Sequence, residues 1–281
     1  MVADTLALWE FHQPDKTGFV RLVRIMEQLG KEHDLGGDTP SRLAMKQMLE
    51  ASLNGETAGI RLYSSRSLEL ADSPLLHRIA MYNTATAFYM VDAPEETLEI
   101  AGELISEYYD VLHLTDKRVV ARNAKYLSDD LGSDFDTLDE LKRLADTLEL
   151  RARALNEIRQ HSGLCRLHAM KFYQIAHVPM SLMKVGQDVV DEFISLLGDP
   201  FEARWVIETL LLPIVKEYRL VDYVVPVRAQ YAVILAYCGE DDAARRLIGE
   251  LEAFAVSEFR RRELENQARL IEKITVERPF I

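Results

Sequence analysis

The stretch "RAQYAVILAYCGEDDAARRLIGELEA" (residues 228–253) carries the pattern that decides the fold. Apolar residues recur at spacings of three and four up to Gly239, as on one face of an α-helix, and the pattern restarts at Ala244. Small residues allow two helices to approach closely where they cross, and large residues fill the seam between them. The stretch therefore predicts two antiparallel helices joined by a short turn.

Residues 82–107, "YNTATAFYMVDAPEETLEIAGELISE", repeat this spacing without a gap. The intervals are +3, +4, +5, +4 and +3 in both stretches, and the paired positions are Ala85 and Ala232, Phe88 and Leu235, Asp92 and Gly239, Thr97 and Ala244, Ala101 and Ile248, and Leu104 and Leu251. Residues 167–190 match more weakly, because they lack the turn glycine and have Asp188 where a small residue is expected. The matching positions there are Ala169, Phe172, Ala176 and Ser181.

This spacing resembles the tetratricopeptide repeat, which places small and large residues at the same intervals. The resemblance implies a solenoid of stacked helical hairpins, in which the first helices line a concave binding groove. The groove positions of the family fall on Tyr82, Thr86 and Tyr89, where aromatic and hydroxyl groups could bind an extended peptide or a partner helix. The alternative fold is an irregular helical bundle. In the alternative interpretation of the tyrosines, they complete the hydrophobic core and do not line a groove.

The remainder of the chain also has helical periodicity, so the sequence predicts an all-α fold. Helices are expected at about 16–31, 40–54, 57–71, 74–91, 94–112, 117–129, 135–160, 164–177, 180–197, 200–218, 221–238, 240–255 and 257–275. The best candidate for a strand is "VDYVVPV" (221–227), but its interior Pro226 favours the helical interpretation.

The long helix expected at 135–160 suggests an N-terminal helical half, residues 1–133, and a C-terminal helical-repeat half, residues 134–281, that continues it. Four leucines in this helix lie near heptad spacing and also fit a homodimer element: Leu141, Leu144, Leu148 and Leu155.

The formal net charge of −13, from 33 basic and 46 acidic residues, opposes direct binding of nucleic acid. No uncharged apolar run reaches the length of about 18 residues that a membrane helix needs. The two cysteines fit a reducing compartment, and the first residues lack a basic signal-peptide region. We therefore expect a cytoplasmic protein that does not contact membranes.

The segment "HSGLCRLHAMKFYQIAHVPM" (161–180) contains a possible metal site. His161, Cys165 and His168 have the spacing of one helix face, but Gly163 is expected to interrupt or start the helix between them. Gly-x-Ser-x-Gly, phosphate-loop and dinucleotide motifs are absent from the sequence, and Ser181-x-x-Lys184 lacks the companion motifs of serine acyl enzymes. We therefore predict a non-enzymatic protein with neither metal nor cofactor, and an all-α metal- or cofactor-dependent enzyme is the alternative.

Cationic and amide side chains are concentrated in the most apolar third of this acidic chain. Stacked helices could direct several of them into one site for an anionic group: His168, Lys171, Lys184, Gln187, Arg204 and Arg228. In the alternative interpretation the lysines reach solvent, and Arg204 pairs with Glu208 one turn away. The sequence thus predicts a binding or regulatory protein that recognises a peptide, a protein partner or a small anionic ligand. By analogy with the family it resembles, it could be the sensor part of a bacterial regulatory system.

Overall fold

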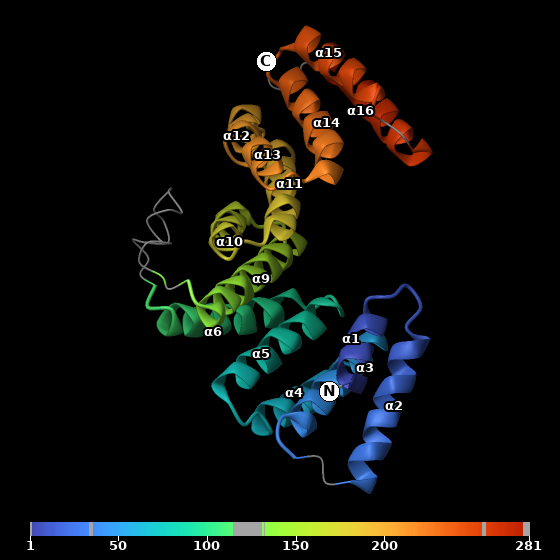
Figure 1. Cartoon of the computed structure of the whole chain (residues 1–281), viewed down its shortest axis with the longest axis vertical. Helices are drawn as coiled ribbons and strands as arrows, with labels where there is room; N and C mark the ends of the chain where they lie inside the picture. The colour runs from blue at the N-terminus through green and yellow to red at the C-terminus, as the bar shows by residue number, and fades with distance from the viewer. Residues whose placement is uncertain (1, 34–35, 115–130, 132, 255–256, 278–281) are drawn as a thin grey trace. The chain divides into compact units, whose positions relative to one another are not determined.

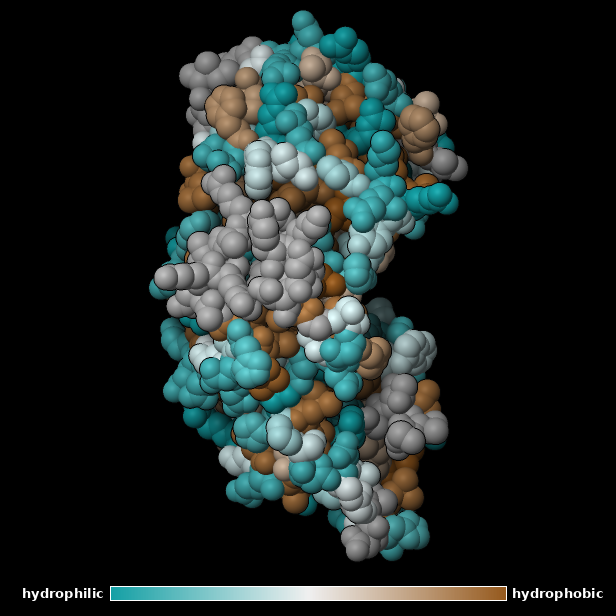
Figure 2. All heavy atoms as spheres, turned by 60° about the vertical axis from the view of Figure 1, so that its left-hand side comes forward, coloured by the Kyte–Doolittle hydropathy of each residue, from teal (hydrophilic) through white to brown (hydrophobic). Residues whose placement is uncertain are grey.

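The computed structural model describes residues 2–33, 36–114, 131, 133–254 and 257–277. Within these ranges the chain forms helices joined by short turns and contains no strand, so the all-α prediction is confirmed (Figure 1). The helix predicted at 117–129 lies outside the described residues. None of the described helices is long and apolar enough to cross a membrane. Hydrophilic and hydrophobic side chains are interspersed over the face in view in Figure 2.

The chain divides into two compact units, one containing residues 1–115 and 146–162 and the other residues 116–145 and 163–281. The division falls within α9 (Phe135–Glu157), whereas the boundary expected from the sequence precedes this helix. The first unit contains α1 (Val2–Phe11), α2 (Thr17–Glu32), α3 (Thr39–Leu53), α4 (Thr57–Glu69), α5 (Pro74–Tyr89) and α6 (Pro94–Val111). The second contains α10 (Gly163–Ile175), α11 (Pro179–Ser195), α12 (Pro200–Val206), the π-helix η1 (Ile207–Leu211), α13 (Leu212–Glu217), α14 (Val221–Tyr237), α15 (Asp241–Glu252) and α16 (Glu258–Glu277).

Helical hairpins are the building blocks of both units. The most extensively packed helix pairs are consecutive in sequence: α3 with α4, α5 with α6, α10 with α11, and α14 with α15. In the first unit the α3–α4 hairpin packs against α5, and in the second α14 and α15 both pack against α16. The α10–α11 hairpin also packs against the element that follows it, through contacts of α11 with α12.

These four hairpins share one turn geometry. In each turn, a residue two or three positions after the end of the first helix has a left-handed backbone, with φ of 71° at Gly55, 55° at Asp92, 55° at His177 and 83° at Gly239. The next residue donates its N–H to a carbonyl five residues earlier, for example Ala93 to Phe88 at 3.1 Å and Glu240 to Leu235 at 2.9 Å. This is the Schellman arrangement that ends many helices. Two of the four hairpins have no glycine at this position, and Asp92 and His177 adopt the same conformation there.

Apart from the exposed turn positions Asp92 and Gly239, the positions paired by the sequence pattern are buried. Ala85, Ala101 and Leu104 are fully buried in the first stretch, and Ala232, Ala244 and Leu251 are fully buried in the second. Thr97 is also buried, and its Oγ1 donates to the carbonyls of Ala93 at 2.9 Å and Ala85 at 3.3 Å. The hydroxyl is therefore satisfied by the backbone where the pattern favours alanine.

The main difference from the predicted elements lies in residues 200–218, where the sequence predicts one continuous helix. This segment consists of α12, η1 and α13, and the N–H of Leu212 bonds to the carbonyl of Ile207, five residues earlier. Pro213 has no N–H to donate, and its ring would clash with the carbonyl four residues before it. A π-turn widens the helix at this point and accommodates the proline.

The second interior proline, Pro226, lies within α14, so "VDYVVPV" is helical. Because Pro226 cannot donate to the carbonyl of Asp222, that oxygen lacks its usual partner in the helix. Arg260 on α16 supplies a donor instead, with Nη2 3.5 Å from the Asp222 oxygen. Helix α1 is an element that the sequence analysis did not predict.

Candidate ligand-binding site

A pocket of about 360 Å³ lies in the second unit, between α10, α11 and the α12–η1–α13 segment. Its walls are mainly apolar and include Leu164, Leu167, Leu182, Trp205, Leu210 and Ile214. Four polar side chains also line it: His168, Lys171, Gln174 and Glu202. Apolar walls with a few polar groups are the usual composition of a small-molecule site.

A glycine on α11 allows the helices beside this pocket to pack closely. A Cβ atom on Gly186 of α11 would lie 2.3 Å from Cδ2 of Leu211 in η1 and 3.1 Å from Cε of Met170 in α10. Glycine therefore allows α11 to pass close to both walls. At the outer edge the apolar side chains are accessible, with Trp205 42% and Leu164 59% exposed. The pocket thus has exposed apolar side chains in its wall.

His168 is electrically neutral at pH 7 in this environment. Burial, reinforced by the nearby ammonium of Lys171, lowers the pKa of His168 from 6.5 to about 4. Burial also lowers the pKa of Lys171. The sequence analysis treated His168 as part of a cationic cluster, and here it is instead a neutral donor or acceptor of hydrogen bonds. The cationic group at the pocket is the ammonium of Lys171.

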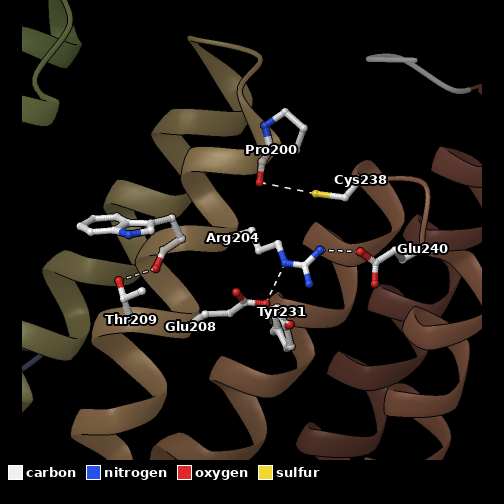
Figure 3. Close-up of polar contacts among 8 residues, drawn as sticks. Pro200, Arg204, Glu208, Thr209, Tyr231, Cys238 and Glu240 are labelled. Carbon is white, nitrogen blue, oxygen red and sulfur yellow. Dashed lines mark hydrogen bonds and ion pairs between the residues drawn. The ribbon is translucent and has the colours of Figure 1, made fainter.

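Among the six residues predicted to form one anion site, His168 and Lys171 line this pocket and the other four do not. Lys184 is exposed on α11. Arg204 does not line the pocket. It pairs with Glu208 at 2.7 Å, as the alternative interpretation of the sequence proposed, and also with Glu240 (Figure 3). Tyr231 of α14 donates to the same Glu208 carboxylate. Arg204 and Glu208 therefore join the α12–η1 segment to the α14–α15 hairpin.

Gln187 and Arg228 lie outside the pocket as well. The carbonyl of Gln187 accepts a hydrogen bond from Gln230 Nε2 at 3.2 Å, and its side chain lines a separate groove. Arg228 Nη2 lies 3.1 Å from Glu250 Oε2 on α15. The six residues therefore do not form one site, because only His168 and Lys171 share the pocket. Spacing along the chain identifies helix faces, but it does not identify which faces meet.

The aromatic stripe expected on a groove lies in the first unit, beside the second part of α9. Tyr89 donates to Glu157 Oε1 at 3.4 Å, and Thr86 Oγ1 donates to the Tyr82 carbonyl at 2.9 Å. Burial, with a further contribution from the negative charge of Asp146, raises the pKa of Tyr82 to about 12. Tyr82, Thr86 and Tyr89 are all half-buried. They pack beside a helix of their own chain, which favours a role in completing the core.

The residues considered for a metal site are separated by the start of a helix. α10 begins at Gly163, so His161 precedes it, whereas Cys165 and His168 lie within it. Within the described part of the chain, no group of three histidine, cysteine, aspartate or glutamate side chains is placed to hold a metal ion.

Three pocket residues, Leu164, Trp205 and Leu210, were not singled out by the sequence. Their apolar character fits a core as well as a pocket, so periodicity alone does not distinguish them. The available signal was Pro213 inside a helical pattern, because an interrupted helix often marks a functional region.

No protein-family model matches this sequence, and no curated protein matches it either.

Proposed function

We propose that this chain is a non-enzymatic binding protein whose ligand occupies the pocket between α10, α11 and the α12–η1–α13 segment. The observation that carries the proposal is the placement of His168 and Lys171 in a mainly apolar pocket, whose other polar lining residues are Gln174 and Glu202. The ligand has a mainly apolar body and one anionic group, most simply a carboxylate. The ammonium of Lys171 provides charge complementarity, and the neutral imidazole of His168 donates a hydrogen bond.

The hairpin architecture supports a binding role. A tetratricopeptide-like solenoid holds its ligands on the surface formed by its first helices, and stacked hairpins with the same turn are consistent with that arrangement. α10 is the first helix of its hairpin and forms one wall of the pocket. A regulatory role in which the α14–α15 hairpin contacts a protein or peptide partner fits the same proposal, because Arg204 links that hairpin to the pocket segment.

The proposal is tested by a thermal-shift screen of the full chain, followed by calorimetry. The screen compares unbranched carboxylates of increasing length with matched alcohols, inorganic phosphate and short acidic peptides. A ligand present at 100 times its dissociation constant stabilises the folded state by about 2.7 kcal/mol, which visibly raises the melting temperature. We expect carboxylates with longer apolar chains to give the largest shifts, because each buried methylene adds about 0.8 kcal/mol.

Matched variants locate the site of binding. Lys171→Met removes the ammonium that lines the pocket, and Lys184→Met removes an exposed ammonium from α11. Leu210→Phe adds bulk to the pocket wall, and Leu62→Phe makes the same change at an exposed position on α4. We expect the two pocket variants to weaken carboxylate binding at least about tenfold and the two controls to leave it unchanged. Equal effects of Lys171→Met and Lys184→Met would contradict the proposal.

A further inference from the structure

The pocket proposed as the ligand site is lined by a carboxylate as well as by an ammonium. Glu202 of α12 and Lys171 of α10 both line it, and α10 and α12 each pack against α11. Glu202 precedes Trp205 by three residues, so the carboxylate and the indole ring are neighbours on one face of α12. The pocket therefore has opposite charges on two different helices.

The capping interactions of α12 do not use the Glu202 carboxylate. Asp199 is the N-cap residue and Glu202 follows three positions later, which is the spacing of a capping box. In that motif the acid accepts the N–H of the N-cap residue, but here the N–H of Asp199 donates to the carbonyl of Phe193 at 2.8 Å. Because Glu202 is also exposed, its carboxylate is accessible to a ligand in the pocket.

Trp205 makes this part of the pocket favourable for a cation. The face of a tryptophan ring attracts an ammonium group, and Trp205 is 42% exposed. The neighbouring Glu202 carboxylate adds a negative charge and oxygen acceptors for N–H donors. The α12 side of the pocket therefore suits an ammonium group, whereas Lys171 on α10 suits a carboxylate.

We propose, on the basis of the ligand pocket proposed above, that the ligand is a linear ω-amino carboxylate. Its carboxylate pairs with Lys171, and its terminal ammonium pairs with Glu202 beside Trp205. The chain between the two charges contacts the apolar lining, which includes Leu182 of α11 and Leu210 of η1. An apolar spacer is part of the proposal, because the two charged residues belong to separate helices.

Three ligands of equal chain length separate these contributions. Octanoate carries only the carboxylate, 8-aminooctanoate adds an ammonium at the far end, and 2-aminooctanoate carries both charges on adjacent carbon atoms. Calorimetry of the full chain should show that 8-aminooctanoate binds at least about fivefold more tightly than octanoate or 2-aminooctanoate.

Matched variants assign this preference to Glu202. Glu202→Gln removes the charge and keeps the size of the side chain, so it should abolish the preference for 8-aminooctanoate and change octanoate binding by less than about twofold. The control Glu217→Gln removes another exposed carboxylate, on α13, that does not line the pocket, and it should keep the preference. Glu202→Lys should favour octanedioate over 8-aminooctanoate, because the α12 side then carries an ammonium.

The possible failures of the two proposals are distinguishable. Lys171-dependent binding of octanoate without a preference for 8-aminooctanoate would overturn this inference and leave the proposed pocket in place. A preference that survives Glu202→Gln would overturn it as well. If no carboxylate of any chain length binds, the proposed function itself is wrong, and this inference is wrong with it.

Discussion

Arg166 of α10 and Glu192 of α11 form a buried ion pair, with Nη1 2.8 Å from Oε2 and only 7% and 3% of their side chains exposed. The pair joins the two helices of the hairpin that forms part of the proposed pocket. Removing one member of a buried pair leaves an uncompensated charge in the interior, which is far more costly than losing an exposed pair.

We therefore predict that Glu192→Gln lowers the free energy of unfolding by about 3 kcal/mol, measured by urea denaturation. The control is Glu258→Gln, because Glu258 and its partner Arg262 are both largely exposed on α16. An exposed pair contributes little, so we expect the control to change the unfolding free energy by less than about 1 kcal/mol. Similar effects of the two substitutions would show that the buried pair has no special role in the hairpin.

The shared turn geometry predicts opposite effects of two substitutions. His177 holds a left-handed backbone with φ of 55°, which costs a side-chain-bearing residue about 1 kcal/mol relative to glycine. His177→Gly should raise the free energy of unfolding by up to that amount, after losing the weak contact of Nδ1 with the Tyr218 hydroxyl at 3.3 Å. Gly239→Ala should lower it by about 1 kcal/mol, and thermal denaturation measures both. A destabilising His177→Gly together with a neutral Gly239→Ala would argue against a common turn.

His168 predicts a specific dependence of stability on pH. Its pKa is about 4 in the folded chain and about 6.5 when unfolded, so between these values the unfolded state binds more protons. The contribution of His168 to the free energy of unfolding is fully present above pH 6.5 and is lost as the pH falls towards 4. The free energy of unfolding changes there by up to about 1.4 kcal/mol per pH unit.

Replacing the imidazole of His168 should weaken the dependence of the unfolding free energy on pH between about pH 4 and about pH 7. We expect the difference in unfolding free energy between the wild type and His168→Gln to shrink as the pH falls from about 7 to about 4. Urea denaturation at a series of pH values provides the comparison, and the same substitution at the exposed His33 serves as the control. A His168→Gln curve parallel to the wild-type curve would mean that the imidazole titrates as it does in solvent.

Much of the helical architecture follows from local rules. Spacings of three and four locate the helices, and the turn positions Asp92 and Gly239, paired from sequence, adopt the same left-handed conformation. The exception is the segment around Pro213, where the choice between a kink, a break and a π-turn depends on packing. Leu211 is fully buried beside Gly186, and this tertiary contact could not be deduced from periodicity.

The candidate site was predictable only in part. His168 and Lys171 lie three residues apart on α10, so their proximity follows from helix geometry. Arg204 and Arg228 are equally cationic, but carboxylates on other elements neutralise them. Trp205 completes the opposite wall of the pocket because α12 packs against α11, a relationship between separate helices. A single sequence does not show which polar residues will be neutralised or which apolar residues will line a cavity.

The most direct test of the proposed pocket uses the fluorescence of Trp205. The chain has two tryptophans, and Trp9→Phe on α1 leaves Trp205 as the only one. Trp205 lines the pocket and is 42% exposed, so a ligand with an apolar body should exclude water from its indole ring. Titration of Trp9→Phe with the carboxylate that binds best should give a saturable blue shift with the dissociation constant found by calorimetry, and Lys171→Met should weaken both in parallel. Calorimetric binding of that carboxylate with no change in the Trp205 spectrum would contradict the assignment of this pocket as the ligand site.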